Sequence, residues 1–170
     1  ARRFVGELGF SPDFAGFPEA RRPATLDVEG PVMLAPLHDY QVLAAGQIKA
    51  LIRGESPARG MLALPTGAGK TRVAVQAMTE EVRDGNLAGP LLWIAQSDEL
   101  CEQAVQTWAY VWRAVGPSTR LVISRFWGSN EVVEESDAVQ LVVATPEKLS
   151  GAAAKASYSW MQGMSLVVVD

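Results

Sequence analysis

The chain has 170 residues, with 15 Lys and Arg against 19 Asp and Glu, and a formal net charge of -4. This length suits one ordinary domain, and a content of 48% hydrophobic and 20% charged residues is typical of a soluble globular protein and excludes a disordered chain. The negative charge argues against non-specific coating of nucleic acid, so any such contact needs a local binding patch. No apolar run approaches the ~20 residues that a membrane span requires, so no membrane partner is expected.

The cysteine content and the first residues indicate the compartment. Cys101 is the single cysteine, and it can form neither an intrachain disulfide nor a cysteine-based metal site. The first residues lack the long apolar core of a secretory signal. Both features predict a protein of the reducing cytoplasm.

Residues 1–36 differ in composition from the rest of the chain. Five prolines and four glycines interrupt this stretch and exclude a long helix. Its four phenylalanines are more than a simple linker needs. We therefore expect an irregular Pro/Gly/Phe-rich arm, which packs either on a protein partner or on its own domain.

From residue 37 onward, apolar runs alternate with helical patterns. The periodicity predicts helices at 39–53, 70–83 and 98–114, and a short helix after Thr145-Pro146. Short apolar runs predict five strands, at 61–64, 91–95, 121–124, 139–144 and 166–170. Strands that are almost wholly apolar and separated by helices indicate an α/β domain over 37–170, with a parallel sheet and helices on both faces.

Residues 65–71 read Pro-Thr-Gly-Ala-Gly-Lys-Thr, between a predicted strand and a predicted amphipathic helix. This is the context of a phosphate-binding loop, although the strict pattern has a glycine where this chain has Leu64. The glycines let several backbone N–H groups point at one phosphate, and the helix adds its positive end. Lys70 would reach the β- and γ-phosphates, and the hydroxyl of Thr71 would hold Mg²⁺.

This form of the loop resembles motif I of superfamily 2 helicases and translocases. Residues 37–41 read Leu-His-Asp-Tyr-Gln and resemble the Leu-x-x-Tyr-Gln element of DEAD/DEAH-type and restriction-motor helicases, in which the glutamine reads adenine. Residues 166–170 resemble the Walker B strand of motif II, whose terminal aspartate orders the Mg²⁺ shell. The resemblance implies ATP and Mg²⁺ as cofactors, Lys70 and Asp170 as catalytic residues, Thr71 and Asp170 on the metal, and a nucleotide site of Gln41, Thr66, Gly67, Ala68, Gly69, Lys70 and Thr71.

Two further segments resemble motifs that hold nucleic acid in that family. Residues 93–103 resemble motif Ia, with Gln96 and Ser97 at the strand end, and residues 142–149 resemble motif Ib, with Thr145 at its start. Backbone N–H groups and hydroxyls at such positions can hold a phosphate, although Ser97 could equally cap a helix that binds no ligand. Arg125, beside two aromatic residues after a predicted strand, could contact a single strand, or these residues could pack the fold.

The resemblance covers residues 37–170 and implies the first RecA-like domain of an ATP-dependent helicase or translocase, with DNA favoured over RNA and a role in restriction or phage defence. In that family a glutamate follows the Walker B aspartate, and a second RecA-like lobe completes the active site. We therefore expect a domain that is incomplete at its C-terminal end, at motif II, and nearly inactive alone. A P-loop kinase of another class and a nucleotide-dependent docking module without catalysis remain as alternatives.

Overall fold

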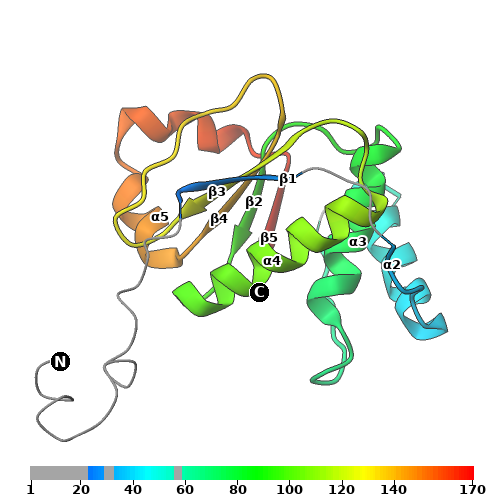
Figure 1. The fold of residues 1–170 in the computed structure, drawn as a ribbon. Helices are drawn as coiled ribbons and strands as arrows, with labels where there is room; N and C mark the ends of the chain where they lie inside the picture. Colours follow the sequence, from blue (N-terminus) through cyan, green and yellow to red (C-terminus); the bar gives the residue numbers. More distant parts are fainter. Residues whose placement is uncertain (1–22, 29–32, 56–58) are drawn as a thin grey trace, which may run out of the picture.

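The structure is a computed structural model, and it describes residues 23–28, 33–55 and 59–170 of the chain (Figure 1). Most of the arm predicted at 1–36 lies outside these residues, so the boundary at residue 37 stays a prediction. Among the described helices, none combines the length and the apolar character needed to cross a membrane.

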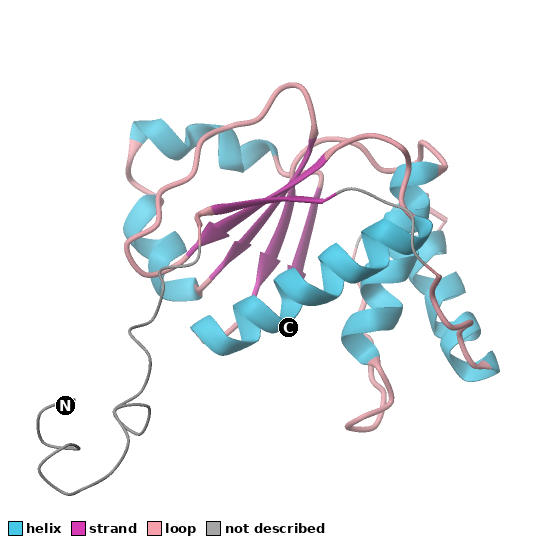
Figure 2. Ribbon diagram, in the orientation of Figure 1, coloured by secondary structure: helices cyan, strands magenta, loops and turns pink. Residues whose placement is uncertain are grey.

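A five-stranded sheet lies at the centre of the described residues (Figure 2). Its strands, in order across the sheet, are β1 (Thr25–Val28), β3 (Leu121–Phe126), β4 (Val139–Ala144), β2 (Leu91–Ile94) and β5 (Leu166–Val169). The last four are parallel, whereas β1 runs antiparallel to β3. The register sets Ile94 beside both Ala144 and Val169, so three neighbouring strands end at one edge of the sheet.

Helices cover both faces of this sheet, which confirms the predicted α/β class (Figure 2). The helices are α2 (Asp39–Ile52), α3 (Lys70–Arg83), α4 (Asp98–Val115), α5 (Pro146–Ala152) and the 3-10 helix η2 (Ala156–Gly163). Along β2, Leu91 and Trp93 join the core beneath α3 and α4, while Leu92 joins the core beneath α5 and η2. This alternation follows from the two-residue period of a strand, so a wholly apolar strand supplies both cores.

The helix α4 shows how the sequence determines one of these layers. Ser97 caps its first turn by accepting a hydrogen bond from the backbone N–H of Leu100, at 3.4 Å. Trp108 is fully buried and meets Trp93 of β2 edge-on, with ring centroids 6.3 Å apart. The helix is therefore fixed at the end that carries Ser97 and along the face that covers the sheet.

The prediction of a strand at 61–64 is wrong. None of the described strands pairs with these residues, and Met61 is 94% exposed. Leu62 and Leu64 instead pack against the small core between α2 and α3. A short apolar run does not by itself indicate pairing, because a strand needs a neighbour to satisfy its backbone groups. The fifth strand is β1, within the stretch 1–36 that was expected to be irregular.

Candidate functional site

The loop before α3 has the backbone shape that its glycines allow. Gly67 and Gly69 both have φ of 79°, in the left-handed region that other residues rarely adopt. The N–H of Ala68 donates to the carbonyl of Pro65 at 3.1 Å, which closes the turn. Lys70 is the first residue of α3 and follows the second glycine directly. The loop therefore curves around the N-terminus of a 14-residue helix, as a phosphate-binding loop requires.

The side chain of Lys70 folds back across this loop. Its ammonium donates to the carbonyl of Leu64 at 2.9 Å and to that of Pro65 at 3.4 Å. Both acceptors are neutral, so a phosphate oxygen would offer this ammonium a stronger, charge-assisted hydrogen bond. The position of Lys70 fits the predicted role.

Thr71 and Asp170 come together although 99 residues separate them in the sequence. The hydroxyl of Thr71 donates to Oδ2 of Asp170 at 3.4 Å. Asp170 is held there because its N–H donates to the carbonyl of Ile94 at 2.9 Å, just beyond the last pair of β2 and β5. A hydroxyl and a carboxylate beside a phosphate loop are the oxygen ligands that Mg²⁺ prefers, so these residues fit ATP with Mg²⁺.

Gln41 attaches the start of α2 to the loop. Its side chain is 5% exposed, its amide nitrogen donates to the carbonyl of Ala68 at 2.9 Å, and its amide oxygen accepts from the N–H of His38 at 3.0 Å. The contact is close, since a Cβ placed on Gly69 would lie 2.9 Å from the amide nitrogen. Each polar atom of the amide keeps one further hydrogen-bonding position, and adenine recognition by Gln41 stays a prediction.

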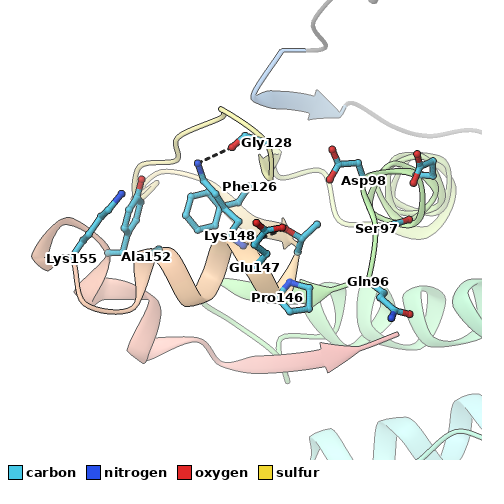
Figure 3. Close-up of a pocket in the computed structure, with 14 residues that line it drawn as sticks. Gln96, Ser97, Asp98, Phe126, Gly128, Pro146, Glu147, Lys148, Ala152 and Lys155 are labelled. Carbon is cyan, nitrogen blue, oxygen red and sulfur yellow. Dashed lines mark hydrogen bonds between the residues drawn. The ribbon is translucent and has the colours of Figure 1, made fainter.

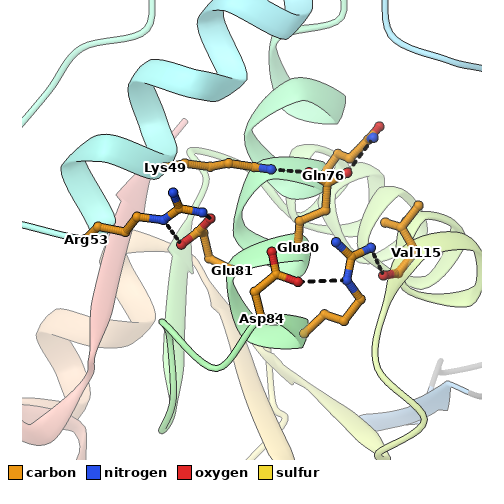
Figure 4. Close-up of polar contacts among 8 residues, drawn as sticks. Lys49, Arg53, Gln76, Glu80, Glu81, Asp84 and Val115 are labelled. Carbon is orange, nitrogen blue, oxygen red and sulfur yellow. Dashed lines mark hydrogen bonds and ion pairs between the residues drawn. The ribbon is translucent and has the colours of Figure 1, made fainter.

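Ion pairs fix the other end of α2 (Figure 4). Arg53 donates to both carboxylate oxygens of Glu81 on α3, at 2.9 and 2.7 Å, and Lys49 pairs with Glu80 at 2.5 Å. The side chain of Glu81 is fully buried, and its hydrogen bonds with Arg53 raise the pKa of the Arg53 guanidinium above its ordinary value. Because α2 is anchored at both ends, Gln41 has a fixed position relative to the helix that carries Lys70 and Thr71.

Three of the four residues predicted to hold nucleic acid meet in a pocket of about 850 Å³ at the carboxyl ends of β2 and β4 (Figure 3). Gln96, Ser97 and Thr145 all line it. Gln96 is exposed, Ser97 is half-buried and Thr145 is 9% exposed. Thr145 caps α5, accepting a hydrogen bond from the N–H of Lys148 at 3.4 Å. Both hydroxyls therefore cap helices, the alternative that the sequence leaves open for Ser97.

Charges of both signs surround this pocket. Asp98 and Glu99 belong to α4, whereas Glu147, Lys148 and Lys155 lie on the α5 side. The hydroxyl of Ser97 lowers the pKa of the Glu99 carboxyl below its ordinary value, because a hydrogen bond to the carboxylate favours its ionised form. The two lysines are the cations among the residues that line the pocket, and Lys148 belongs to the segment that resembles motif Ib, where it could add positive charge.

The structure does not support Arg125 as a nucleic-acid contact. Its side chain is 4% exposed, and its guanidinium donates to Glu102 of α4 at 2.9 and 3.3 Å and to the carbonyl of Pro23 at 2.9 Å. The strand β3 extends two residues further than predicted, so Arg125 lies inside the strand and not after it. In the sequence, Glu102 stands beside the apolar face of its helix. A charged residue at such a position indicates a buried partner, which here is Arg125.

The described site defines a class of protein: a P-loop nucleotide-binding α/β domain with an aspartate behind its loop. Residues 34–170 match the family described as type III restriction enzyme, res subunit, and the chain belongs to this family. It is therefore an ATP-dependent helicase-like domain with a RecA-like fold, as the resemblance to superfamily 2 restriction motors implied. No curated protein and no solved structure matches the chain.

Proposed function

We propose that the chain is the ATP-binding lobe of a cytoplasmic motor that acts on DNA in restriction or phage defence. The observation that carries the nucleotide part is the contact between Thr71 and Asp170, which places a Walker B carboxylate against a glycine-shaped loop. The family description, which names a restriction enzyme, supports DNA and restriction. A second RecA-like lobe is the partner that this class of motor requires across the nucleotide.

In this proposal, backbone N–H groups of the loop other than that of Ala68, together with the N-terminus of α3, bind the phosphates. Lys70 exchanges its bonds to the carbonyls of Leu64 and Pro65 for a phosphate oxygen, and the two carbonyls guide its stem. Thr71 and Asp170 would hold Mg²⁺, which neutralises charge on the phosphates. The chain's own contribution is a preorganised cradle, so little energy is spent on ordering the loop when ATP binds.

Gln41 supplies base recognition in this proposal. Its remaining amide N–H and its remaining oxygen lone pair match the acceptor and donor edge of adenine. The hydrogen bond from Gln41 to the carbonyl of Ala68 links base recognition to the phosphate loop. A nucleotide with another base would lose both of its hydrogen bonds to the amide of Gln41. We expect ATP to bind more tightly than GTP for this reason.

The nucleic-acid track crosses the strand ends at Gln96, Ser97 and Thr145. These residues follow two neighbouring strands of the sheet and line one pocket, which supports a single path for the nucleic acid. Hydroxyls and backbone groups would bind phosphates, which position the nucleic acid without reading its sequence. If RNA binds the chain as tightly as DNA does, the assignment of DNA is wrong and the motor assignment survives.

The Lys70→Ala variant tests the nucleotide part. Titration with a fluorescent ATP analogue in the presence of Mg²⁺ should show an affinity at least about tenfold lower, because one charge-assisted bond is lost. The matched control is Lys155→Ala, which removes a lysine from the other pocket and should leave the affinity for ATP unchanged. A folded Lys70→Ala variant that binds ATP normally would show that the loop is not the phosphate site.

A further inference from the structure

The ammonium of Lys148 is surrounded by partners from its own chain. It donates to the carbonyl of Gly128 at 3.1 Å, pairs with the carboxylate of Glu131 at 3.1 Å and lies 5.2 Å from the ring centroid of Phe126. Figure 3 shows Lys148 reaching from α5 past the Phe126 ring to Gly128. Gly128 and Glu131 belong to the segment that follows β3, so this segment closes over a lysine of the pocket.

The partners of Lys148 differ in how easily they can be exchanged. The lysine side chain is 19% exposed, whereas that of Glu131 is 62% exposed. An ion pair with one partner so open to water contributes little to stability, so the carboxylate can be replaced at little cost. Phe126 is fully buried and keeps the lysine stem in place when the carboxylate leaves.

Lys148 also belongs to the same helical turn as the proposed phosphate contact. Its N–H donates to the hydroxyl of Thr145, and both residues line the pocket. A phosphate bound at this hydroxyl therefore occupies the same pocket as a lysine that is paired with Glu131. Two anions, the carboxylate and the phosphate, would compete for one cation.

We propose that Glu131 is a built-in competitor of the nucleic-acid backbone for Lys148. A backbone phosphate entering the pocket displaces the carboxylate, while the carbonyl of Gly128 and the ring of Phe126 continue to hold the lysine. Glu131 thus weakens the binding of isolated phosphates and favours a strand that makes several contacts at once. The inference rests on the proposed nucleic-acid track and adds to it a residue that opposes binding.

The segment around Glu131 is anchored independently of this ion pair. Gln140 of β4 is 1% exposed, and its amide donates to the carbonyl of Val133 at 2.7 Å and accepts from the N–H of Glu135 at 3.1 Å. A substitution of Glu131 should therefore leave the segment in place. This makes Glu131→Gln, which keeps the size of the side chain, a suitable probe.

The experiment compares Glu131→Gln with Glu134→Gln in the 170-residue chain. Glu134 is an exposed glutamate of the same segment, and none of the described residues forms an ion pair with it. Fluorescence anisotropy with labelled oligothymidylate at low ionic strength should show about two- to fivefold tighter binding for Glu131→Gln, the range expected for one exposed ion pair. Glu134→Gln, which changes only the overall charge, should show a clearly smaller gain.

A second pair of variants distinguishes competition from general charge. In a Lys148→Met background, the gain from Glu131→Gln should disappear, because the cation that both anions seek is absent. Equal gains for the two glutamates, or a full gain without Lys148, would overturn the inference and leave the nucleic-acid track intact. Absence of binding by every variant, the unmodified chain included, would overturn both.

Discussion

The two sides of the candidate site are prepared for their ligands in different ways. On the nucleotide side, the backbone is already shaped by Gly67 and Gly69, and Lys70 bonds only to neutral carbonyls. On the nucleic-acid side, Thr145 caps a helix and Lys148 is paired with a carboxylate. The first side exchanges hydrogen bonds with neutral carbonyls for bonds to phosphate, whereas the second must displace a carboxylate from an ion pair.

This difference separates two kinds of effect. A substitution on the nucleotide side should change affinity through the shape of the loop. A substitution of Thr145 should change stability and affinity together, because its hydroxyl caps a helix and would also contact the ligand. Substitutions can test this separation, first at Arg125, which is buried and lies outside the candidate site.

The largest effect is expected for Arg125→Met, which breaks the buried ion pair with Glu102. Removal of one partner from such a pair destabilises a fold by about 3–5 kcal/mol, and here the bond to the carbonyl of Pro23 is lost as well. Urea denaturation should show this loss of stability. At temperatures where the variant is folded, its affinity for oligothymidylate should equal that of the unmodified chain, and a selective loss of affinity would return Arg125 to the interface.

Gly69→Ala should combine a moderate loss of stability with a loss of ATP affinity. A left-handed residue with a Cβ is strained by about 1–2 kcal/mol, and the new methyl group would lie 2.9 Å from the amide nitrogen of Gln41. Titration with the ATP analogue should show about tenfold weaker binding, the affinity that ~1.4 kcal/mol of misplacement removes. Thermal unfolding gives the stability.

The matched control is Gly46→Ala, in the middle of α2, where nothing lies within 4 Å of the added methyl group. This variant should be more stable by about 0.5–1 kcal/mol, because alanine is the better helix former, and it should bind ATP normally. If both variants lose affinity alike, the shape of the loop is not what determines binding.

The correct and the incorrect sequence predictions show which features depend on the local sequence and which depend on distant segments. The helices α2, α3 and α4 were predicted to within one residue, because periodicity and caps are local. The loop was predicted because glycines stand at the two positions whose backbone is left-handed, and their spacing is visible in the local sequence. The strand at 61–64 and the role of Arg125 failed, because strand pairing depends on distant segments and an error of two residues in the end of β3 changes a surface residue into a buried one.

Thr145→Ala should lower stability and nucleic-acid affinity together. The helix cap is worth about 1 kcal/mol, and loss of one phosphate contact should reduce the salt slope of single-strand binding by about 0.7. Denaturation and anisotropy at several salt concentrations measure the two effects. Thr145→Ser keeps the hydroxyl and should retain both, so a Ser variant as weak as the Ala variant would show that the methyl group, and not the hydroxyl, is the important part.

The smallest effect is expected at Cys101. Its reactivity with a thiol reagent reports whether the N-terminus of α4 opens when nucleic acid binds. Its thiol is fully buried near the carbonyl of Ala95, one residue before Gln96, and burial raises its pKa from an ordinary 9.0 to about 11. The thiolate population is then about a hundredfold smaller than in the unfolded chain at neutral pH. A thiol reagent should react only after denaturation.

The same shift gives a pH dependence with a definite sign. The folded state holds the thiol proton more tightly, so this group favours folding below pH 9.0 and the advantage is lost as the pH rises toward 11. Cys101→Ala should therefore flatten stability over that interval. Oligothymidylate should not change the labelling rate at neutral pH, because the proposed exchange involves side chains around Thr145 and Lys148 and leaves α4 closed. Faster labelling would show that the N-terminus of α4 opens when nucleic acid binds.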